Sequence, residues 1–121
     1  MTPEEKQLLL KDLCARMSYG VRIGIDGLSN PMDLYSIAEE DGIFYINGYY
    51  SINETKPYLR PMSSMTEEEE GEFRKIMPSN PSKGENWIQT FDWLNAHHFD
   101  YRGLIKKGLA LEALEGMYET K

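Results

Sequence analysis

Apolar residues at helical spacing define the first element that the chain predicts. They form one stripe of Leu9, Leu10, Leu13, Cys14 and Met17. Thr2 and Glu5 have the spacing of a capping box, Pro3 suits the first helical position, and Gly20 offers a stop. We predict a helix over residues 3–18. Because Cys14 falls on the stripe, we expect it to be a small buried side chain and not a nucleophile.

From Val21 the apolar residues alternate with polar ones, which predicts a strand over 21–25 followed by a turn-rich loop. Three short segments follow, at 32–38, 43–47 and 49–54. They are separated by Asp41-Gly42 and Asn47-Gly48, dipeptides that favour type I′ hairpin turns. The pattern is typical of an antiparallel meander of about four strands.

Two-residue turns would fix the pairing of these strands. The expected pairs are Ala38 with Tyr45, Ile37 with Ile46, Tyr45 with Tyr50, and Ile43 with Ile52. On the face expected to cover the core lie Leu34, Ala38, Ile43, Tyr45, Tyr50 and Ile52. On the other face, expected to be only partly covered, lie Tyr35, Ile37, Phe44, Ile46 and Tyr49.

The segment Lys56–Pro61 contains two prolines, which lack an amide donor and hold the chain extended. We therefore expect it to leave the sheet as a rigid connector. Tyr58 and Leu59 should project to opposite sides, with Leu59 in the core and Tyr58 free for contact with a partner.

The second half of the chain reads as helical. Thr66 and Glu69 form a capping box, Phe73, Ile76 and Met77 give an apolar face, and Pro78 ends the helix. After a loop at 78–85, Asn86 is expected to cap a third helix ending near Phe99, with Trp87, Ile88, Phe91, Leu94 and His98 on its apolar stripe. Asp100 is expected to cap a short helix to Lys107, and 109–113 to form an edge strand or a helical tail.

Together these elements predict a single α+β domain over residues 1–121: an N-terminal helix, the meander, and a helical C-terminal half packed on the sheet. The length of 121 residues is enough for one well-buried core.

Charge and cysteine content limit the partners and the cellular compartment that we expect for this chain. The net charge of −7, from 20 acidic and 13 basic side chains, disfavours direct binding to nucleic acid or to anionic membranes. The N-terminus lacks the features of a signal peptide, and no apolar run reaches the roughly 20 residues of a membrane span. With one cysteine the chain cannot form an internal disulfide, so we expect a reducing, cytoplasmic setting.

His97-His98-Phe99-Asp100 is the string most suggestive of chemistry. Adjacent helical residues point about 100° apart, so one metal ion cannot readily take both imidazoles. We therefore expect His98 to end the apolar stripe and His97 to lie beside Trp93. The alternative is a small metal-dependent or acid–base enzyme that uses His97 or His98 with Asp92 or Asp100. It needs a further His, Asp or Glu from elsewhere in the fold.

The sequence contains no glycine-rich phosphate loop, nucleophile elbow or paired Cys-x-x-Cys, so no cofactor is predicted. Tyr58, Arg60 and Trp93 are expected to be exposed, and their residue types are enriched in interface hot spots. The favoured hypothesis is a non-enzymatic protein-binding module with an unknown protein partner. A special case is an acidic mimic of nucleic acid, which requires the negative charges to cluster on one surface.

Three blocks, at 8–21, 56–69 and 92–113, include the strings Lys-Pro-Tyr-Leu-Arg-Pro and Trp-Leu-Asn-Ala-His-His. With these blocks the chain resembles a family of small uncharacterised proteins encoded by Bacteroidales gut bacteria and by their phages and prophages. The resemblance implies an accessory gene of a mobile element with a role in host interaction, and it assigns no catalytic residue. The family pattern often has proline where this chain has Leu114, so we expect the last element to continue where relatives turn.

Overall fold

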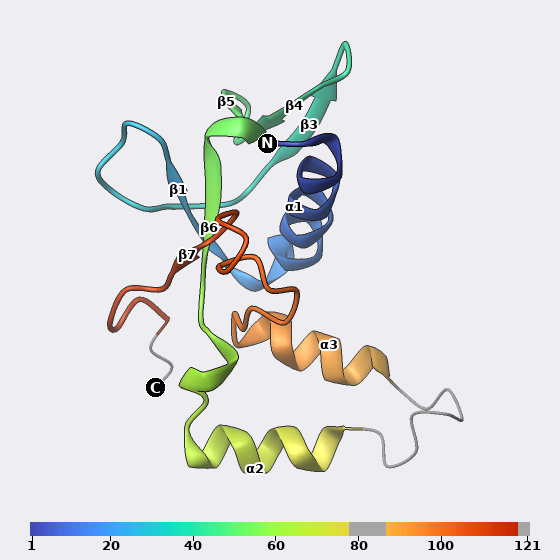
Figure 1. Cartoon of the computed structure of the whole chain (residues 1–121), viewed down its shortest axis with the longest axis vertical. Coiled ribbons are helices and arrows are strands. Elements are labelled where there is room, and N and C mark those ends of the chain that lie inside the picture. The colour runs from blue at the N-terminus through green and yellow to red at the C-terminus, as the bar shows by residue number, and fades with distance from the viewer. Residues whose placement is uncertain (78–86, 119–121) are drawn as a thin grey trace.

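The computed structural model describes residues 1–77 and 87–118, and it confirms the α+β class (Figure 1). The α-helices are α1 (Pro3–Arg16), α2 (Glu67–Ile76) and α3 (Trp87–Ala96). The strands are β1 (Arg22–Ile25), β2 (Met32–Asp33), β3 (Ile37–Glu40), β4 (Ile43–Ile46), β5 (Tyr50–Ser51), β6 (Thr55–Leu59) and β7 (Leu111–Glu112). Short 3₁₀ turns η1 (Met17–Tyr19), η2 (Ile52–Glu54) and η3 (Met62–Ser64) connect them.

The strands form two small sheets where the sequence predicted one meander. One sheet has the order β2-β1-β6-β7, with β6 and β7 parallel and the other pairs antiparallel. The other has the order β3-β4-β5 and is antiparallel throughout. Both sheets lie with α1 at one end of the molecule, and α2 and α3 lie together at the other end (Figure 1).

The N-terminal helix begins as predicted. The Thr2 hydroxyl accepts a hydrogen bond from the Glu5 amide at 3.1 Å, and the Glu5 carboxylate accepts one from the Thr2 amide at 2.8 Å. At the other end Gly20, with φ of 73°, stops η1 in a left-handed conformation. The expected burial of Cys14 is wrong, because this thiol is exposed. It lies about 100° around the helix from Leu13, beyond the face that packs on the core.

A charged pair lies on the buried face of α1. Asp12 and Arg16 are both fully buried and form an ion pair at 2.9 Å. Arg16 also donates a hydrogen bond to the Phe99 carbonyl at 2.7 Å, and the Arg102 guanidinium lies 3.6 Å from Asp12. These contacts tie α1 to the segment that follows α3.

The first hairpin has the predicted turn and register. Asp41 and Gly42 both have positive φ, and Ala38 pairs with Tyr45 as Ile37 pairs with Ile46. The Asn47-Gly48 turn also forms, but the pairing beyond it is shifted by one residue. Ile46 pairs with Tyr50 and Tyr45 with Ser51, so the expected Tyr45–Tyr50 and Ile43–Ile52 pairs are wrong. Ile52 instead begins the 3₁₀ turn η2.

The predicted faces are reversed within the β3–β4 hairpin, whereas Leu34 and Ile52 are buried and Tyr50 packs against the core, as predicted. Ile46 is fully buried, and Ile37 and Phe44 pack against the core, whereas Ala38 and Ile43 are exposed. The buried Asn47 side chain holds the hairpin to the chain that precedes it. It accepts hydrogen bonds from the amides of Tyr35 and Ser36 and donates one to the Asp33 carbonyl, which fixes the turn against the chain that enters β3.

The Lys56–Pro61 segment does not leave the sheet, and the predicted connector is for most of its length the internal strand β6. Pro57 is tolerated because its nitrogen faces away from β1. The Glu54 carbonyl, two residues before Lys56, accepts a hydrogen bond from the Asp26 amide directly after β1. The Leu59 carbonyl accepts one from the Ala113 amide, directly after β7. The backbone groups of odd-numbered residues, including the Pro57 nitrogen, therefore point toward the β7 side of the strand. Because β7 pairs only with Tyr58 and Leu59, no amide donor is needed at Pro57.

In the C-terminal half, the Thr66 capping box begins α2 as predicted. On α3 the expected stripe is partly wrong, because Ile88 and Phe91 are exposed and Thr90 is buried, whereas Leu94 and His98 are buried as predicted. The packing face is set by α2, whose Ile76 carbonyl accepts a hydrogen bond from Thr90. The proposed Asn86 cap, the 78–85 loop and Pro78 lie outside the described residues.

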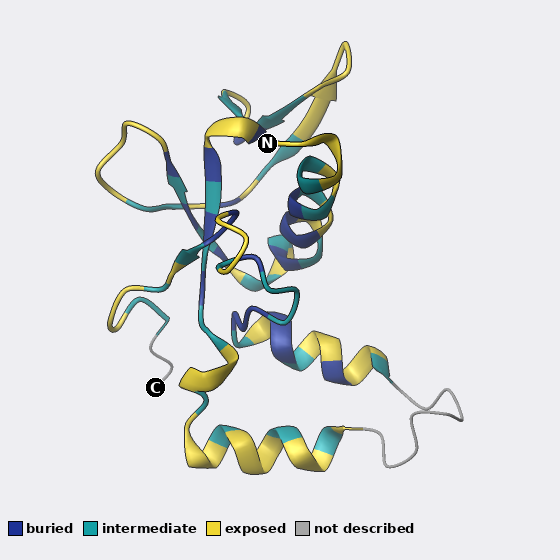
Figure 2. Ribbon diagram, viewed as in Figure 1, coloured by how far each residue is buried: buried dark blue, intermediate teal, exposed yellow. Residues whose placement is uncertain are grey.

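Asp100 caps the following turns through the amides of Leu104 and Ile105, but no regular helix forms there. Of the two predicted forms of the next segment, the edge strand is the one observed, as β7. The core lies between α1, the two sheets and this segment, as the dark blue ribbon of Figure 2 shows. Its buried members are Leu9, Leu13, Val21, Ile23, Ile25, Leu34, Ile46, Ile52, Leu59, Leu104, Leu109 and Ala110.

Candidate functional site

A cleft lies where β6 passes from the sheet into η3 and α2. Its volume is about 490 Å³. One wall is formed by the end of β6, by η3 and by the first turn of α2, and the other by β7 and the segment that follows it. The lining residues are Arg60, Pro61, Ser64, Thr66, Glu68, Glu69, Glu112, Ala113, Leu114, Glu115, Gly116 and Tyr118.

Arg60 supplies the positive charge in this lining, and that charge is already engaged. Its guanidinium makes two hydrogen bonds to the Glu69 carboxylate, at 2.8 and 2.6 Å, and lies 4.2 Å from the centre of the Phe99 ring. Glu69 also accepts a hydrogen bond from the Thr66 amide in the capping box of α2. The hydrogen bonds from Arg60 lower the pKa of Glu69 to about 2, so this carboxylate stays charged.

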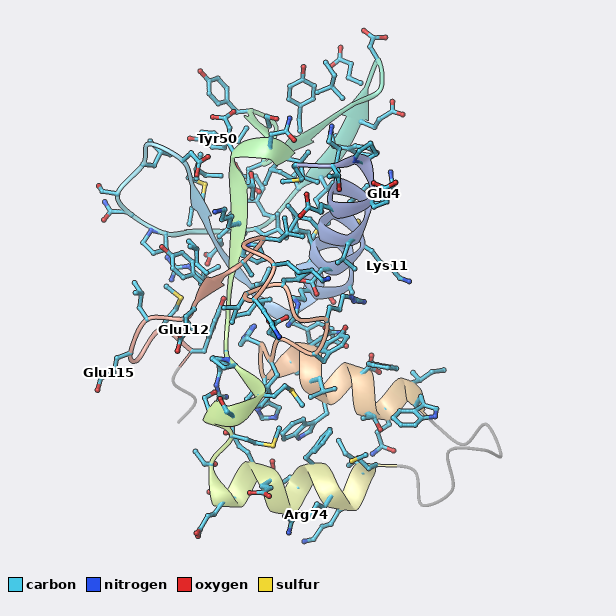
Figure 3. The ribbon with its side chains drawn as sticks, in the orientation of Figure 1. Glu4, Lys11, Tyr50, Arg74, Glu112 and Glu115 are labelled. Carbon is cyan, nitrogen blue, oxygen red and sulfur yellow. The ribbon has the colours of Figure 1, made fainter. Side chains whose placement is uncertain are left out.

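Three other carboxylates in the lining have no such partner. Glu68, Glu112 and Glu115 are exposed, and none of them forms an ion pair with any residue in 1–77 or 87–118. Glu112 and Glu115 extend from the C-terminal segment on the side of the molecule away from α1 (Figure 3). Within the described part of the chain, the lining of the cleft therefore carries a net negative charge shared between its two walls.

Tyr118 is the last lining residue of the wall formed by β7 and the segment that follows it. Its hydroxyl accepts a hydrogen bond from the Arg22 amide at 2.8 Å and donates one to the Tyr58 carbonyl at 2.7 Å. Its ring stacks on His98, with ring centres 3.7 Å apart and an interplanar angle of 16°. Burial raises the pKa of Tyr118 to about 12, which keeps the hydroxyl protonated as a donor.

The four residues of the alternative site do not converge. His97 lies beside Trp93 as predicted, with ring centres 4.1 Å apart, and its Nδ1 atom lies 3.6 Å from Glu69. His98 is buried against Tyr118. Asp100 is used as a cap, and Asp92 accepts a hydrogen bond from the Tyr19 hydroxyl on the exposed side of α3.

One further carboxylate, Glu69, does come near His97, as the enzyme hypothesis requires. However, Glu69 is held by Arg60 and by the α2 capping box, so it is not free to act on a substrate proton. Among the residues that the structure describes, no three His, Cys, Asp or Glu side chains form a group that could hold a metal ion.

The three predicted contact residues are less exposed than expected, since Tyr58, Arg60 and Trp93 are all half-buried. Trp93 stacks on Phe99 and also contacts Phe73, with ring centres 5.8 and 5.6 Å away. Arg60 is the member of the three that lines the cleft. Sequence reasoning missed the opposite wall. Glu112, Glu115 and Tyr118 follow no periodic pattern, and β7 brings them to the cleft through pairing between distant parts of the chain.

The described part of the chain contains no helix that is both long enough and apolar enough to cross a membrane. Comparison with known proteins identified no matching family model, no matching curated protein and no matching solved structure.

Proposed function

We propose that this chain is a non-enzymatic protein-binding module that holds a basic segment of a partner protein in the acidic cleft. The observation that carries the proposal is a set of three carboxylates, Glu68, Glu112 and Glu115, around a cleft of about 490 Å³. None of the three forms an ion pair within residues 1–77 and 87–118. A volume of this size is in the range of sites that take up a side chain or a small ligand.

The chemistry of the lining suits a lysine or arginine side chain. The carboxylates supply charge at the rim, while Pro61, Ala113 and Leu114 offer apolar contact to an aliphatic stem. Leu114 is 55% exposed, so it has apolar surface still to be covered. The net charge of −7 adds a longer-range attraction that would speed the approach of a basic partner.

The position of the titratable groups also favours binding over catalysis. In the cleft, the strongly perturbed carboxyl is Glu69, and its low pKa reflects an ion pair that anchors α2. The resemblance to proteins of Bacteroidales phages and prophages supports an accessory role in the bacterial cytoplasm as part of the same proposal. The nucleic-acid mimic is less favoured, because Glu4 on α1 and Glu115 lie on opposite sides of the molecule (Figure 3).

The test compares two triple variants that each remove three negative charges. The cleft variant is Glu68→Gln, Glu112→Gln and Glu115→Gln, and the control variant is Glu39→Gln, Glu40→Gln and Asp41→Asn on the hairpin tip. Binding of a fluorescein-labelled hexalysine peptide is measured by fluorescence anisotropy. We expect the cleft variant to bind on the order of tenfold more weakly, with little change in the control.

Because both variants alter the net charge equally, they separate a local site from a general electrostatic attraction. An equal loss of affinity in the two variants would show that the peptide follows the net charge of the molecule, and the proposed site would be rejected. Loss only in the hairpin variant would place the binding surface elsewhere.

A further inference from the structure

The second wall of the cleft is a segment held at two points. At its start, the Ala113 amide donates a hydrogen bond to the Leu59 carbonyl at 2.8 Å, next to the two paired residues of β7. At its end, the Tyr118 hydroxyl bonds to Arg22 and Tyr58. Between these points Leu114, Glu115 and Gly116 are exposed. We call residues 113–118 the C-terminal strap.

The Tyr118 hydroxyl occupies a position in the backbone ladder between β1 and β6. The register of these strands pairs Ile23 with Pro57, so Arg22 stands opposite Tyr58. In an unbroken antiparallel pair the Arg22 amide would bond directly to the Tyr58 carbonyl. Here the hydroxyl lies between these two groups and bonds to both. Removal of the oxygen atom would leave a backbone donor and a backbone acceptor without this partner.

Tyr118 is also connected to the charged residues that line the cleft. The ring of Tyr118 stacks on His98, whose carbonyl accepts a hydrogen bond from the Arg60 amide at 2.7 Å. Arg60 in turn holds Glu69 on the opposite wall. One side chain of the strap is therefore connected to the strands and, through His98, to the charged residues of the cleft.

We propose that Tyr118 is a latch that couples docking of the C-terminal strap to binding in the cleft. This inference rests on the proposed function. Glu115 lies on the strap and Glu112 directly before it, while Glu68 lies on α2, so a cation held between the walls attracts the docked strap. By linkage, a change that favours undocking weakens binding, and bound ligand protects the strap by the same factor.

The test uses Tyr118→Phe, which keeps the ring but removes the hydroxyl. We expect hexalysine to bind this variant at least about fivefold more weakly, although no carboxylate has changed. Amide hydrogen exchange, followed by NMR, should be faster at Ala113 in the variant and unchanged at Leu13 in α1. In the unmodified protein, saturating hexalysine should slow exchange at Ala113.

Each contrary result has a distinct meaning. If Tyr118→Phe binds hexalysine as the unmodified protein does, the coupling is wrong and the proposed function stands. If the peptide binds but does not slow exchange at Ala113 in the unmodified protein, the coupling is also wrong, even if the variant fails to fold. If the unmodified protein does not bind hexalysine, the proposed function fails together with the coupling. Unchanged exchange at Ala113 in the variant would reject the latch itself.

Discussion

His98 lies two residues after the end of α3 with φ of 64°, a left-handed conformation that is uncommon for residues other than glycine. Its ring is buried against Tyr118, and its Nδ1 atom has no hydrogen-bond partner among the described residues. Burial, with smaller effects from Arg16, His97 and Arg60, lowers the pKa of His98 from 6.5 to about 4. The imidazole is therefore neutral in the folded protein at neutral pH.

This shift makes stability depend on pH in a defined window. Between about pH 6.5 and pH 4 the unfolded chain binds a proton at His98 that the folded chain does not, so the free energy of unfolding falls as the pH falls. The expected loss is about 2–3 kcal/mol between pH 7 and about pH 4.5. Urea denaturation at the two pH values should show that His98→Asn, which tolerates the same backbone conformation, removes most of this loss. His97→Asn should retain it.

Arg60 allows a second comparison between single residues, because Arg74 forms a similar pair with Glu70. The side chains of Arg60 and Glu69 are 20% and 16% exposed, whereas those of Arg74 and Glu70 are 74% and 49% exposed. Lysine cannot reproduce the two-point contact with the carboxylate or the stacking on Phe99.

We expect Arg60→Lys to lower the free energy of unfolding by about 1–3 kcal/mol and Arg74→Lys to change it by less than about 0.5 kcal/mol. Chemical denaturation of both variants gives the two values. Equal effects would mean that the partial burial of the Arg60 pair adds nothing to its strength.

Some contacts between residues of the site can be predicted from the sequence and others cannot. The contact of His97 with Trp93 follows from their i, i+4 spacing on one helix. The stacking of His98 on Tyr118 joins residues from separate elements, and no local pattern predicts such a pair.

At the scale of elements, local signals were the most informative. The capping boxes at Thr2 and Thr66 marked the starts of α1 and α2 correctly, because both partners of each box lie within one turn. The Asp41-Gly42 turn was equally clear. The predictions of strand pairing and burial failed where contacts between distant parts of the chain decide the structure. Pro57, for example, is tolerated inside a sheet because its nitrogen points past the end of β7. The hydrogen bonds of Asn47 that hold the hairpin against the chain entering β3 join residues 12 and 14 positions apart, beyond the range of a local pattern.

The strand β6 gives a test at this scale, since Leu59 is fully buried in it as predicted. Leu59→Ala removes buried methyl groups from the core and should cost about 2–5 kcal/mol of unfolding free energy. The matched control is Leu114→Ala, the same substitution at a position that is 55% exposed, which should cost less than about 0.5 kcal/mol. Urea denaturation separates the two. A neutral Leu59→Ala would show that β6 is not part of the cooperative core.

At the scale of the whole molecule, the apolar interior has two parts. The main core joins α1 to both sheets, whereas Phe73, Trp93 and Phe99 form an aromatic cluster between α2, α3 and the segment after α3. Charged contacts connect the two parts. Arg16 reaches from α1 to the Phe99 carbonyl, and Arg60, directly after β6, reaches to the ring of Phe99. The prediction of a single domain therefore depends on whether these contacts make the two parts unfold together.

The distribution of aromatic residue types offers a way to answer this question by spectroscopy. Trp87 and Trp93 are the two tryptophans of the chain, and both lie on α3. Tryptophan fluorescence therefore reports on the helical end alone, whereas circular dichroism in the far ultraviolet reports on all helices and strands. If the chain is one cooperative unit, the two signals should give the same urea midpoint and slope. Loss of the fluorescence change at a lower urea concentration would identify α2 and α3 as a separately unfolding unit, able to detach while α1 and the sheets stay intact.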